Sequence, residues 1–120
     1  MKKHVLVVSH GSRDALANAD FKKLVQLYQR KHPNWVVAHA FLEMAEPTIP
    51  QTLNLLASKT NQIEIVLLFL FAARHVKEHI PEIISEFRKE HPQVKIKLGK
   101  PIGPEPKLLK ILDERLKKAR

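Results

Sequence analysis

The strongest constraint on the fold is an alternation, repeated four times, between a short apolar run and a longer amphipathic stretch. This β-then-α rhythm is typical of a parallel sheet covered by helices. We therefore predict four strands, at residues 4–8, 35–42, 63–71 and 94–98. The third run is the most apolar, which predicts a central strand, whereas lysines alternate along the fourth, which predicts an edge strand.

The amphipathic stretches predict four helices. The first follows residue 14 and stops at residues 31–33, the second opens at Glu46-Pro47, and the third carries Pro81 in its first turn. The last presents one apolar face, made by Leu108, Leu109, Leu112 and Leu116. With right-handed crossovers, these elements give an α/β three-layer sandwich whose four-stranded parallel sheet has the order 2-1-3-4.

Chain length and composition narrow the class of protein. A chain of 120 residues is the size of one domain, so residues 1–120 are expected to form a single domain. The absence of cysteine excludes disulfides, thiolate metal sites and cysteine nucleophiles, which leaves His, Asp and Glu as metal ligands. No apolar run is long enough for a secretory signal or a membrane span, which predicts a cytoplasmic protein with no membrane partner.

The net charge of +9 suggests an anionic partner. A small polyanionic substrate and a nucleic acid both fit this charge, and a generally basic, solvated surface explains it as well. The basic residues are spread along the chain, and five Phe, one Trp and one Tyr offer little surface for stacking on bases.

Ligands of such sheets bind beyond the carboxyl ends of the strands, which selects three loops. The first, after residue 8, reads SHGSR and brings His10, Gly11, Ser12 and Arg13 close to a helix N-terminus, where an anion could bind. The loop lacks the glycines of a dinucleotide fingerprint or a phosphate-binding Walker loop, and a G-x-S-x-G nucleophile elbow is also missing. A histidine bonded to backbone in the core is the alternative interpretation of His10.

The second and third loops carry carboxylates and imidazoles. Glu43 and Glu46 follow the second strand; Glu46 would complement a helix dipole, whereas the pair could serve a metal or a proton transfer. His75 and His79 follow the third strand and would share a helix face if the helix already began at His75. A solvated first-turn histidine is the alternative for His79. Because His10 and His75 follow adjacent strands, we predict that they meet at one divalent ion such as cobalt, nickel, ferrous iron or zinc.

Four motifs in register resemble the small sirohydrochlorin chelatases, which insert cobalt, nickel or iron into a tetrapyrrole. They are HGSR after the first strand, LEMAEPTIP after the second, FLFAARHVKEHIP after the third and KPIGPEP before the last helix, and they span essentially the whole chain. The resemblance implies a chelatase-like, flavodoxin-like fold and a homodimer. It also implies that the divalent metal is a substrate and that no cofactor is tightly bound.

The resemblance also assigns residues. His10 is implied as metal ligand and proton acceptor, His75 as the second metal ligand, and Glu46 as a substrate-binding residue. The tetrapyrrole site is implied to be lined by Leu70, Phe71, Ala72, Ala73, Arg74 and His75. The loops themselves add four candidate accessory residues: Ser12, Arg13, Glu43 and His79. The chain departs from the family where Ala73-Arg74 replace small residues and where His79 replaces an aspartate.

Two other functions compete with metal insertion. A tetrapyrrole or metal carrier without catalytic activity would use the same pocket and would bind its ligand without accelerating metallation. A nucleic-acid-binding module rests on the net charge alone and leaves the residues of the three loops unexplained.

Overall fold

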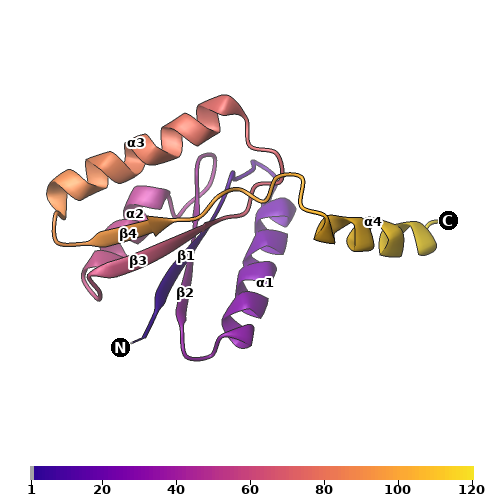
Figure 1. The fold of residues 1–120 in the computed structure, drawn as a ribbon, viewed down its shortest axis with the longest axis horizontal. Coiled ribbons are helices and arrows are strands. Elements are labelled where there is room, and N and C mark those ends of the chain that lie inside the picture. Colours follow the sequence, from indigo (N-terminus) through magenta and orange to yellow (C-terminus); the bar gives the residue numbers. More distant parts are fainter. Residues whose placement is uncertain (1) are drawn as a thin grey trace.

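A computed structural model describes residues 2–120, which fold as an α/β protein around a four-stranded, all-parallel sheet. The strand order is β2-β1-β3-β4, as the sequence predicts. Figure 1 follows the chain through its elements. These are β1 (His4–Ser9), α1 (Ala15–Lys31), β2 (Val36–Phe41), α2 (Ile49–Ala57), β3 (Gln62–Leu67), α3 (Arg74–Glu90), β4 (Lys95–Leu98) and α4 (Lys107–Lys117).

Strand β3 is interior and β4 lies at the edge, as predicted, and the second interior strand is β1, which pairs with β2 on one side and β3 on the other. Its four middle residues are buried on both faces, as an uninterrupted β-branched run predicts for a central parallel strand. In β3 only Ile63, Ile65 and Leu67 are buried, so one face of this strand is covered and the other is partly open. The two faces of the sheet are therefore not equivalent.

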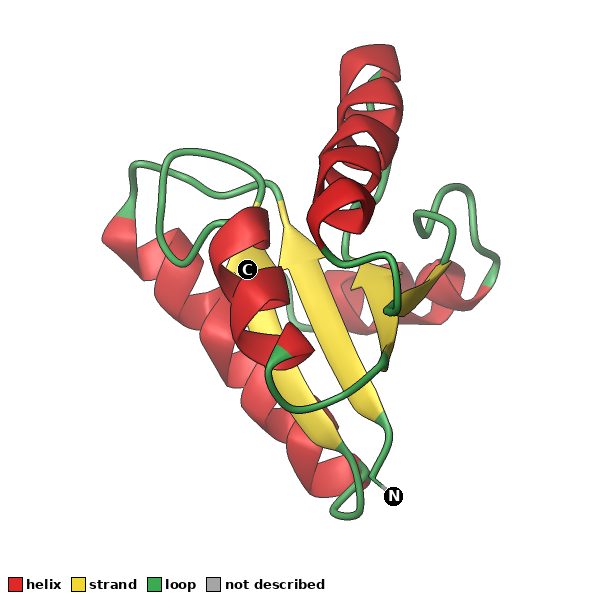
Figure 2. Cartoon of the chain, turned by 90° about the vertical axis from the view of Figure 1, so that its left-hand side faces the viewer, coloured by secondary structure: helices red, strands yellow, loops and turns green. Residues whose placement is uncertain are grey.

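The larger core lies between the sheet and helices α2 and α3. It includes Leu6 and Val8 of β1, Leu53 of α2 and Ile80 of α3, all nearly inaccessible to solvent. On the opposite face α1 buries Phe21 and Val25 against Val5, Val7 and Phe41. Figure 2 shows the three layers that result. No helix within residues 2–120 is long and apolar enough to cross a membrane.

Strand ends differ from the sequence expectation. Strand β2 is shorter than residues 35–42 by one residue at each end, while β3 ends at Leu67 although apolar residues continue to Phe71. After Leu68 donates to Val8 O (2.8 Å), Phe69 and Leu70 instead bond to Ile102 and Gly103, in the connection that follows β4. The apolar composition of residues 68–71 does not reveal this change of hydrogen-bonding partner.

Helix starts also differ. Helix α2 begins at Ile49, where Thr48 and Gln51 form a capping box, so Pro50 rather than Pro47 occupies the first turn and Glu46 precedes the helix. Helix α3 begins at Arg74, so Pro81 lies inside the helix rather than in its first turn. The early start buries Val76 in the larger core. A first-turn position is the simpler expectation for Pro81, because proline inside a helix lacks one hydrogen bond.

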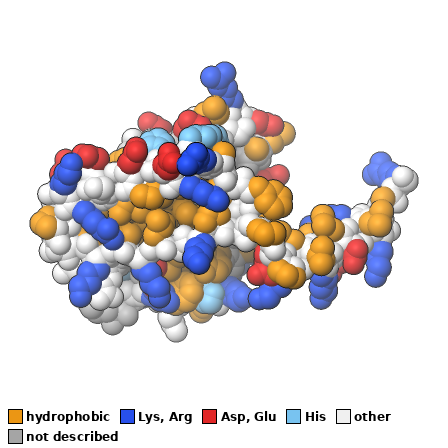
Figure 3. Space-filling model, turned by 45° about the horizontal axis from the view of Figure 1, so that its top comes forward, with side chains coloured by type: hydrophobic (Ala, Val, Ile, Leu, Met, Phe, Trp, Pro, Cys, Tyr) orange, Lys and Arg blue, Asp and Glu red, His pale blue; other side chains and the backbone are white. Residues whose placement is uncertain are grey.

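The last helix departs most from expectation. A three-layer sandwich predicts that its leucine face packs on the sheet, yet α4 has no buried residue and projects from the carboxyl edge of the sheet (Figure 1). The radius of gyration is 15.4 Å, against about 14 Å for a compact domain of this length. Figure 3 shows hydrophobic side chains along the projecting helix.

Candidate site at the carboxyl edge of the sheet

The candidate site is built on two loops that follow the adjacent strands β1 and β2. Their backbones continue the pairing of the strands, because Leu42 donates to Ser9 O (2.9 Å) and Glu43 donates to His10 O (3.0 Å). Gly11 has a φ of +93°, and a Cβ atom there would overlap the backbone oxygen of Glu43. Only glycine therefore allows the first two loops to lie this close.

This close approach brings His10 and Glu43 together. Both ring nitrogens of His10 face oxygen acceptors: Nδ1 lies 3.1 Å from Gly11 O, and Nε2 lies 2.8 Å from Glu43 Oε1, so a proton or a metal ion must stand between Nε2 and the carboxylate. Both side chains are roughly half exposed. Next to this pair, Met44 has a φ of +65°, an uncommon conformation for a side-chain-bearing residue. Such strain persists where surrounding contacts fix the backbone.

The remaining residues of the first loop have mainly structural contacts. The Ser12 hydroxyl accepts from Asp14 N, and Asn18 both accepts from Ser12 N and donates to Ser12 O. Asp14 in turn caps α1 by accepting from Leu16 N. Arg13 is exposed on the surface beside this turn. Ser12 therefore shapes the turn, and Arg13 is free to meet a ligand.

The two glutamates of the second loop have different surroundings. Glu43 faces His10, whereas the exposed Glu46 accepts a long 3.5 Å hydrogen bond from Gln51 Nε2 of α2. The family resemblance implies a substrate-binding role for Glu46, whereas the residues by themselves explain Glu46 through the helix dipole and leave Glu43 as a candidate for metal binding or proton transfer. Continuing the β1–β2 register of the structure by two residues pairs Gly11 with Glu43, and the sequence alone does not specify this register.

The third loop presents its side chains to solvent. Leu70 and Phe71 are exposed, by 51% and 76%, although both are large and apolar. Ala72 packs against the larger core, and Ala73 is the N-cap residue of α3 without a side-chain hydrogen bond. The Arg74 guanidinium makes an exposed ion pair with Glu78 (3.4 Å).

His75 and His79 lie on the first two turns of α3 and are exposed. The helix begins before His75, so the two imidazoles have the i, i+4 spacing that places them on one face. Within residues 2–120, no group of three or more His, Cys, Asp or Glu side chains lies close enough to hold a metal ion. His10 and Glu43 are two side chains of this kind that are already in contact.

Among the histidines that lie away from the carboxyl edge, His39 has the most unusual surroundings. His39 of β2 packs against Phe21 and Phe41 under α1, and its Nε2 is buried without a hydrogen-bond partner. Burial, and secondarily the charge of Lys22, lower the pKa of His39. His39 is therefore a half-buried residue of β2 that lies away from the candidate site, and its lowered pKa favours the uncharged imidazole.

The chain is similar to known proteins in both sequence and fold. The sirohydrochlorin cobaltochelatase of Priestia megaterium is 34% identical over 98% of this chain and 38% of its own length. The sirohydrochlorin chelatase SirB of Bacillus subtilis subspecies spizizenii, solved in complex with cobalt, superposes with a TM-score of 0.89 at 32% identity, covering 98% of this chain and 51% of that one. A cobalamin biosynthesis CbiX protein of Marinobacter aquaeolei VT8 has a TM-score of 0.81 at 31% identity, covering 98% of this chain and 99% of that one.

The chain spans half or less of the length of the curated relatives that it matches first. The CbiX family model matches residues 4–119, which is nearly the whole chain. Because this match covers all four motifs, it explains their resemblance to the chelatases: the chain belongs to the CbiX family of sirohydrochlorin chelatases.

Proposed function

We propose that this protein inserts a divalent metal ion, cobalt, nickel or ferrous iron, into sirohydrochlorin. The observation that carries the proposal is the His10–Glu43 pair, with Nε2 and Oε1 2.8 Å apart at the carboxyl edge of the sheet. Family membership supports it, as does the cobalt complex of the relative SirB. An imidazole and a carboxylate without a thiolate suit divalent ions of this borderline class.

The incoming ion is a substrate, so the protein must release it. A closed four-ligand site would retain the metal, whereas two protein donors leave coordination positions open for water and then for the ring nitrogens. In our proposal His10 Nε2 and Glu43 Oε1 bind the ion first, and His75 adds an imidazole from the start of α3. Each protein ligand is then exchanged for a pyrrole nitrogen.

Metal insertion releases two protons, because the ring enters with two pyrrole N–H groups and leaves with four nitrogens on the metal. Because His10 Nδ1 donates to Gly11 O, Nε2 is the nitrogen that exchanges a proton for the metal beside Glu43. The same nitrogen cannot hold the metal and a proton at once, so His10 accepts one pyrrole proton only after the metal has moved to the ring, and the other proton passes to solvent water. The Glu43 carboxylate then stabilises the imidazolium.

Sirohydrochlorin combines a flat apolar ring with eight carboxylates, and the edge offers partners for both. Leu70 and Phe71 are exposed apolar side chains that would cover the ring beside Ala72 and Ala73. Arg13 and Arg74 are exposed cations whose planar guanidinium groups match carboxylates. We assign Glu46, on the second loop, a role in positioning the substrate.

The proposed functional unit is a homodimer of two single-domain chains of 120 residues. The chain matches 51% of SirB with a TM-score of 0.89, so a second copy would supply what the other half of SirB supplies. The Marinobacter chain, which is covered to 99%, is a relative of similar length that also has one such half, and this supports the proposal.

The test is an anaerobic absorbance assay of sirohydrochlorin metallation with Co²⁺, Ni²⁺ and Fe²⁺ in turn. We expect the wild type to exceed the spontaneous rate and both His10→Ala and His75→Ala to lose that acceleration. His4→Ala is the matched control, because His4 begins β1 at the opposite edge of the sheet and bonds only to Lys2 O. Stoichiometric binding without acceleration would identify a carrier, and full activity in both variants would refute the proposed ligands.

A further inference from the structure

Helix α4 has an apolar face that no part of residues 2–120 covers. Leu109, Leu112 and Leu116 follow one another at helical spacing and are exposed by 62%, 63% and 73%. Leu108 and Ile111 widen the same face, while Lys110, Glu114 and Lys117 occupy the opposite one. An 11-residue helix is marginal in water by itself, because most helical stability in proteins comes from packing an apolar face.

The same chain has an apolar groove that lacks a helix. We call it the α1–β3 groove; it has a volume of 360 Å³ and is lined by Leu24, Leu27 and Tyr28 of α1 and by Val66 and Leu68 at the end of β3. Its lining is almost entirely apolar, yet Leu24, Leu27 and Val66 are exposed. Helix α1 covers the β2 and β1 side of this face, so a second helix is missing over β3 and β4.

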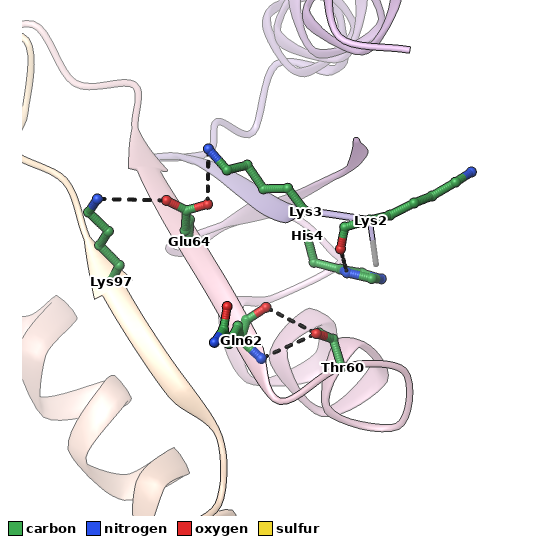
Figure 4. Close-up of polar contacts among 7 residues, drawn as sticks. All are labelled: Lys2, Lys3, His4, Thr60, Gln62, Glu64 and Lys97. Atoms are coloured by element: carbon green, nitrogen blue, oxygen red, sulfur yellow. Dashed lines mark hydrogen bonds and ion pairs between the residues drawn. The ribbon is translucent and has the colours of Figure 1, made fainter. Parts of the chain in front are cut away.

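Charged residues confine the groove to one half of the sheet. Glu64 lies two residues before Val66 on the same face of β3, between Lys3 (3.3 Å), which directly precedes β1, and Lys97 (3.9 Å) of β4 (Figure 4). The amino-terminal half of the open face is therefore polar. The apolar half ends at the carboxyl edge, from which α4 projects.

The connection to α4 turns the helix away from the groove of its own chain. Ile102 donates to Phe69 O (2.9 Å) and Gly103 to Leu70 O (2.7 Å), which holds the connection to the third loop. Only residues 104–106 then separate this attachment from α4, and two of the three are prolines with restricted φ angles. Folding α4 back onto its own chain would require these hydrogen bonds to break or the short proline segment to reverse.

We propose that two copies exchange their α4 helices, so that the leucine face of α4 from each copy fills the α1–β3 groove of the other. The carboxyl edges of the two copies then face each other, and each copy completes the helix layer of its partner. Exchange of identical elements gives a closed two-fold dimer in which both unpartnered apolar surfaces are buried. The proposal rests on the homodimer proposed above and names the surfaces that form it.

Multi-angle light scattering of the full chain tests the surfaces. We expect a dimer for the wild type, and a monomer for Leu112→Lys in the helix and for Val66→Lys in the groove. Lys110→Glu and Lys117→Glu, on the polar face of α4, are matched controls and should remain dimers. A monomeric wild type, or a dimer unaffected by both Leu112→Lys and Val66→Lys, would overturn the proposal.

Cross-linking distinguishes exchange from a helix that folds back. The chain has no cysteine, so Leu112→Cys combined with Val66→Cys introduces the only two thiols. With a short bismaleimide, exchange produces a covalent dimer, and mixing the two single variants produces the same species. A cross-link that leaves the double variant at monomer size would show that α4 covers its own groove, and would refute the exchange.

These outcomes are independent of the metal chemistry. Co²⁺ titration of His10→Ala reports on the candidate site, and light scattering of the same variant reports on the dimer. If His10→Ala loses Co²⁺ binding but remains an exchanged dimer, the metal site and the dimer are shown to be independent, and the exchange is supported. A chelatase that is active as an unexchanged dimer would overturn only the present one.

Discussion

The two halves of the carboxyl edge differ in how firmly their side chains are held. In the fixed half, residues 9–13 and 42–44, backbone hydrogen bonds join two loops and set the 2.8 Å contact between His10 and Glu43. In the open half, residues 70–75, Leu70, Phe71 and Arg74 extend into solvent. The comparison suggests that the fixed half is ready to receive an ion before substrate arrives, whereas the open half acquires its contacts from the substrate.

The largest effect is expected at Gly11, which holds the fixed half together. An alanine Cβ would overlap the backbone oxygen of Glu43 at a positive φ, so Gly11→Ala should cost about 3–5 kcal/mol of unfolding free energy and abolish metal binding. Chemical denaturation and Co²⁺ titration measure the two losses.

Gly103→Ala is the control for this prediction. Gly103 also has a positive φ, of +63°, but a Cβ atom there would meet no atom within 4 Å, so only the backbone strain of about 1–2 kcal/mol applies. Equal destabilisation by the two substitutions would mean that the contact between the loops contributes little. The fixed half would then be no firmer than the open one.

The next effect separates the two glutamates. Glu43→Gln removes the carboxylate beside His10 Nε2, and we expect the affinity for Co²⁺ to fall about 10–100-fold. Glu46→Gln changes a carboxylate whose hydrogen-bond partner is Gln51, so its Co²⁺ affinity should change less than about threefold. Isothermal titration without tetrapyrrole measures both. The reverse ranking would move the first metal contact away from the fixed half.

A smaller effect, on stability at acidic pH, is expected from His39 of β2, the strand that leads into the second loop of the fixed half. The pKa of His39 is lowered by burial and by Lys22, so the unfolded chain binds a proton more readily than the folded one. The folded state keeps its full stability above the ordinary histidine pKa of about 6.5 and loses stability as the pH falls below it, until the folded pKa is passed.

His39→Gln should remove this loss. Denaturation midpoints of the wild type and the variant, compared between neutral pH and mildly acidic pH, isolate the contribution of His39 from that of the other histidines. An identical pH dependence in both proteins would show that His39 is as well solvated in the folded chain as in the unfolded one.

The sheet was predictable because its signals are local. Four apolar runs and the right-handed crossover rule lead to the strand order 2-1-3-4, and β1 is buried on both faces as its sequence predicts. The end of β3 and the start of α3 were missed, because they depend on which distant residues Phe69 and Leu70 bond to and on the burial of Val76. Leucine periodicity predicts helix α4 itself but cannot indicate where its apolar face packs.

Within the candidate site, the sequence locates the three loops but does not show which of their residues are in contact. His10 and Glu43 are brought together by a glycine whose φ is +93°, and no spacing pattern expresses that contact. The family resemblance draws attention to Glu46 instead. In the open half, Arg74 and His75 lie at the start of a helix that the sequence begins later, so their proposed contacts with substrate remain predictions.

The smallest effect is expected in the open half, at Arg74. Its side chain is 92% exposed and its ion pair with Glu78 is on the surface, so Arg74→Ala should leave the denaturation midpoint unchanged. We expect tetrapyrrole affinity to fall about two- to fivefold at low salt, because a single exposed charge pair contributes little, and the difference should vanish at high salt. Lys89→Ala is the control: it removes a similar surface pair, with Glu86 (3.0 Å), at the far end of the same helix. A loss of stability in Arg74→Ala, or a salt-independent loss of affinity, would mean that Arg74 is fixed before substrate binds and that the two halves of the edge are alike.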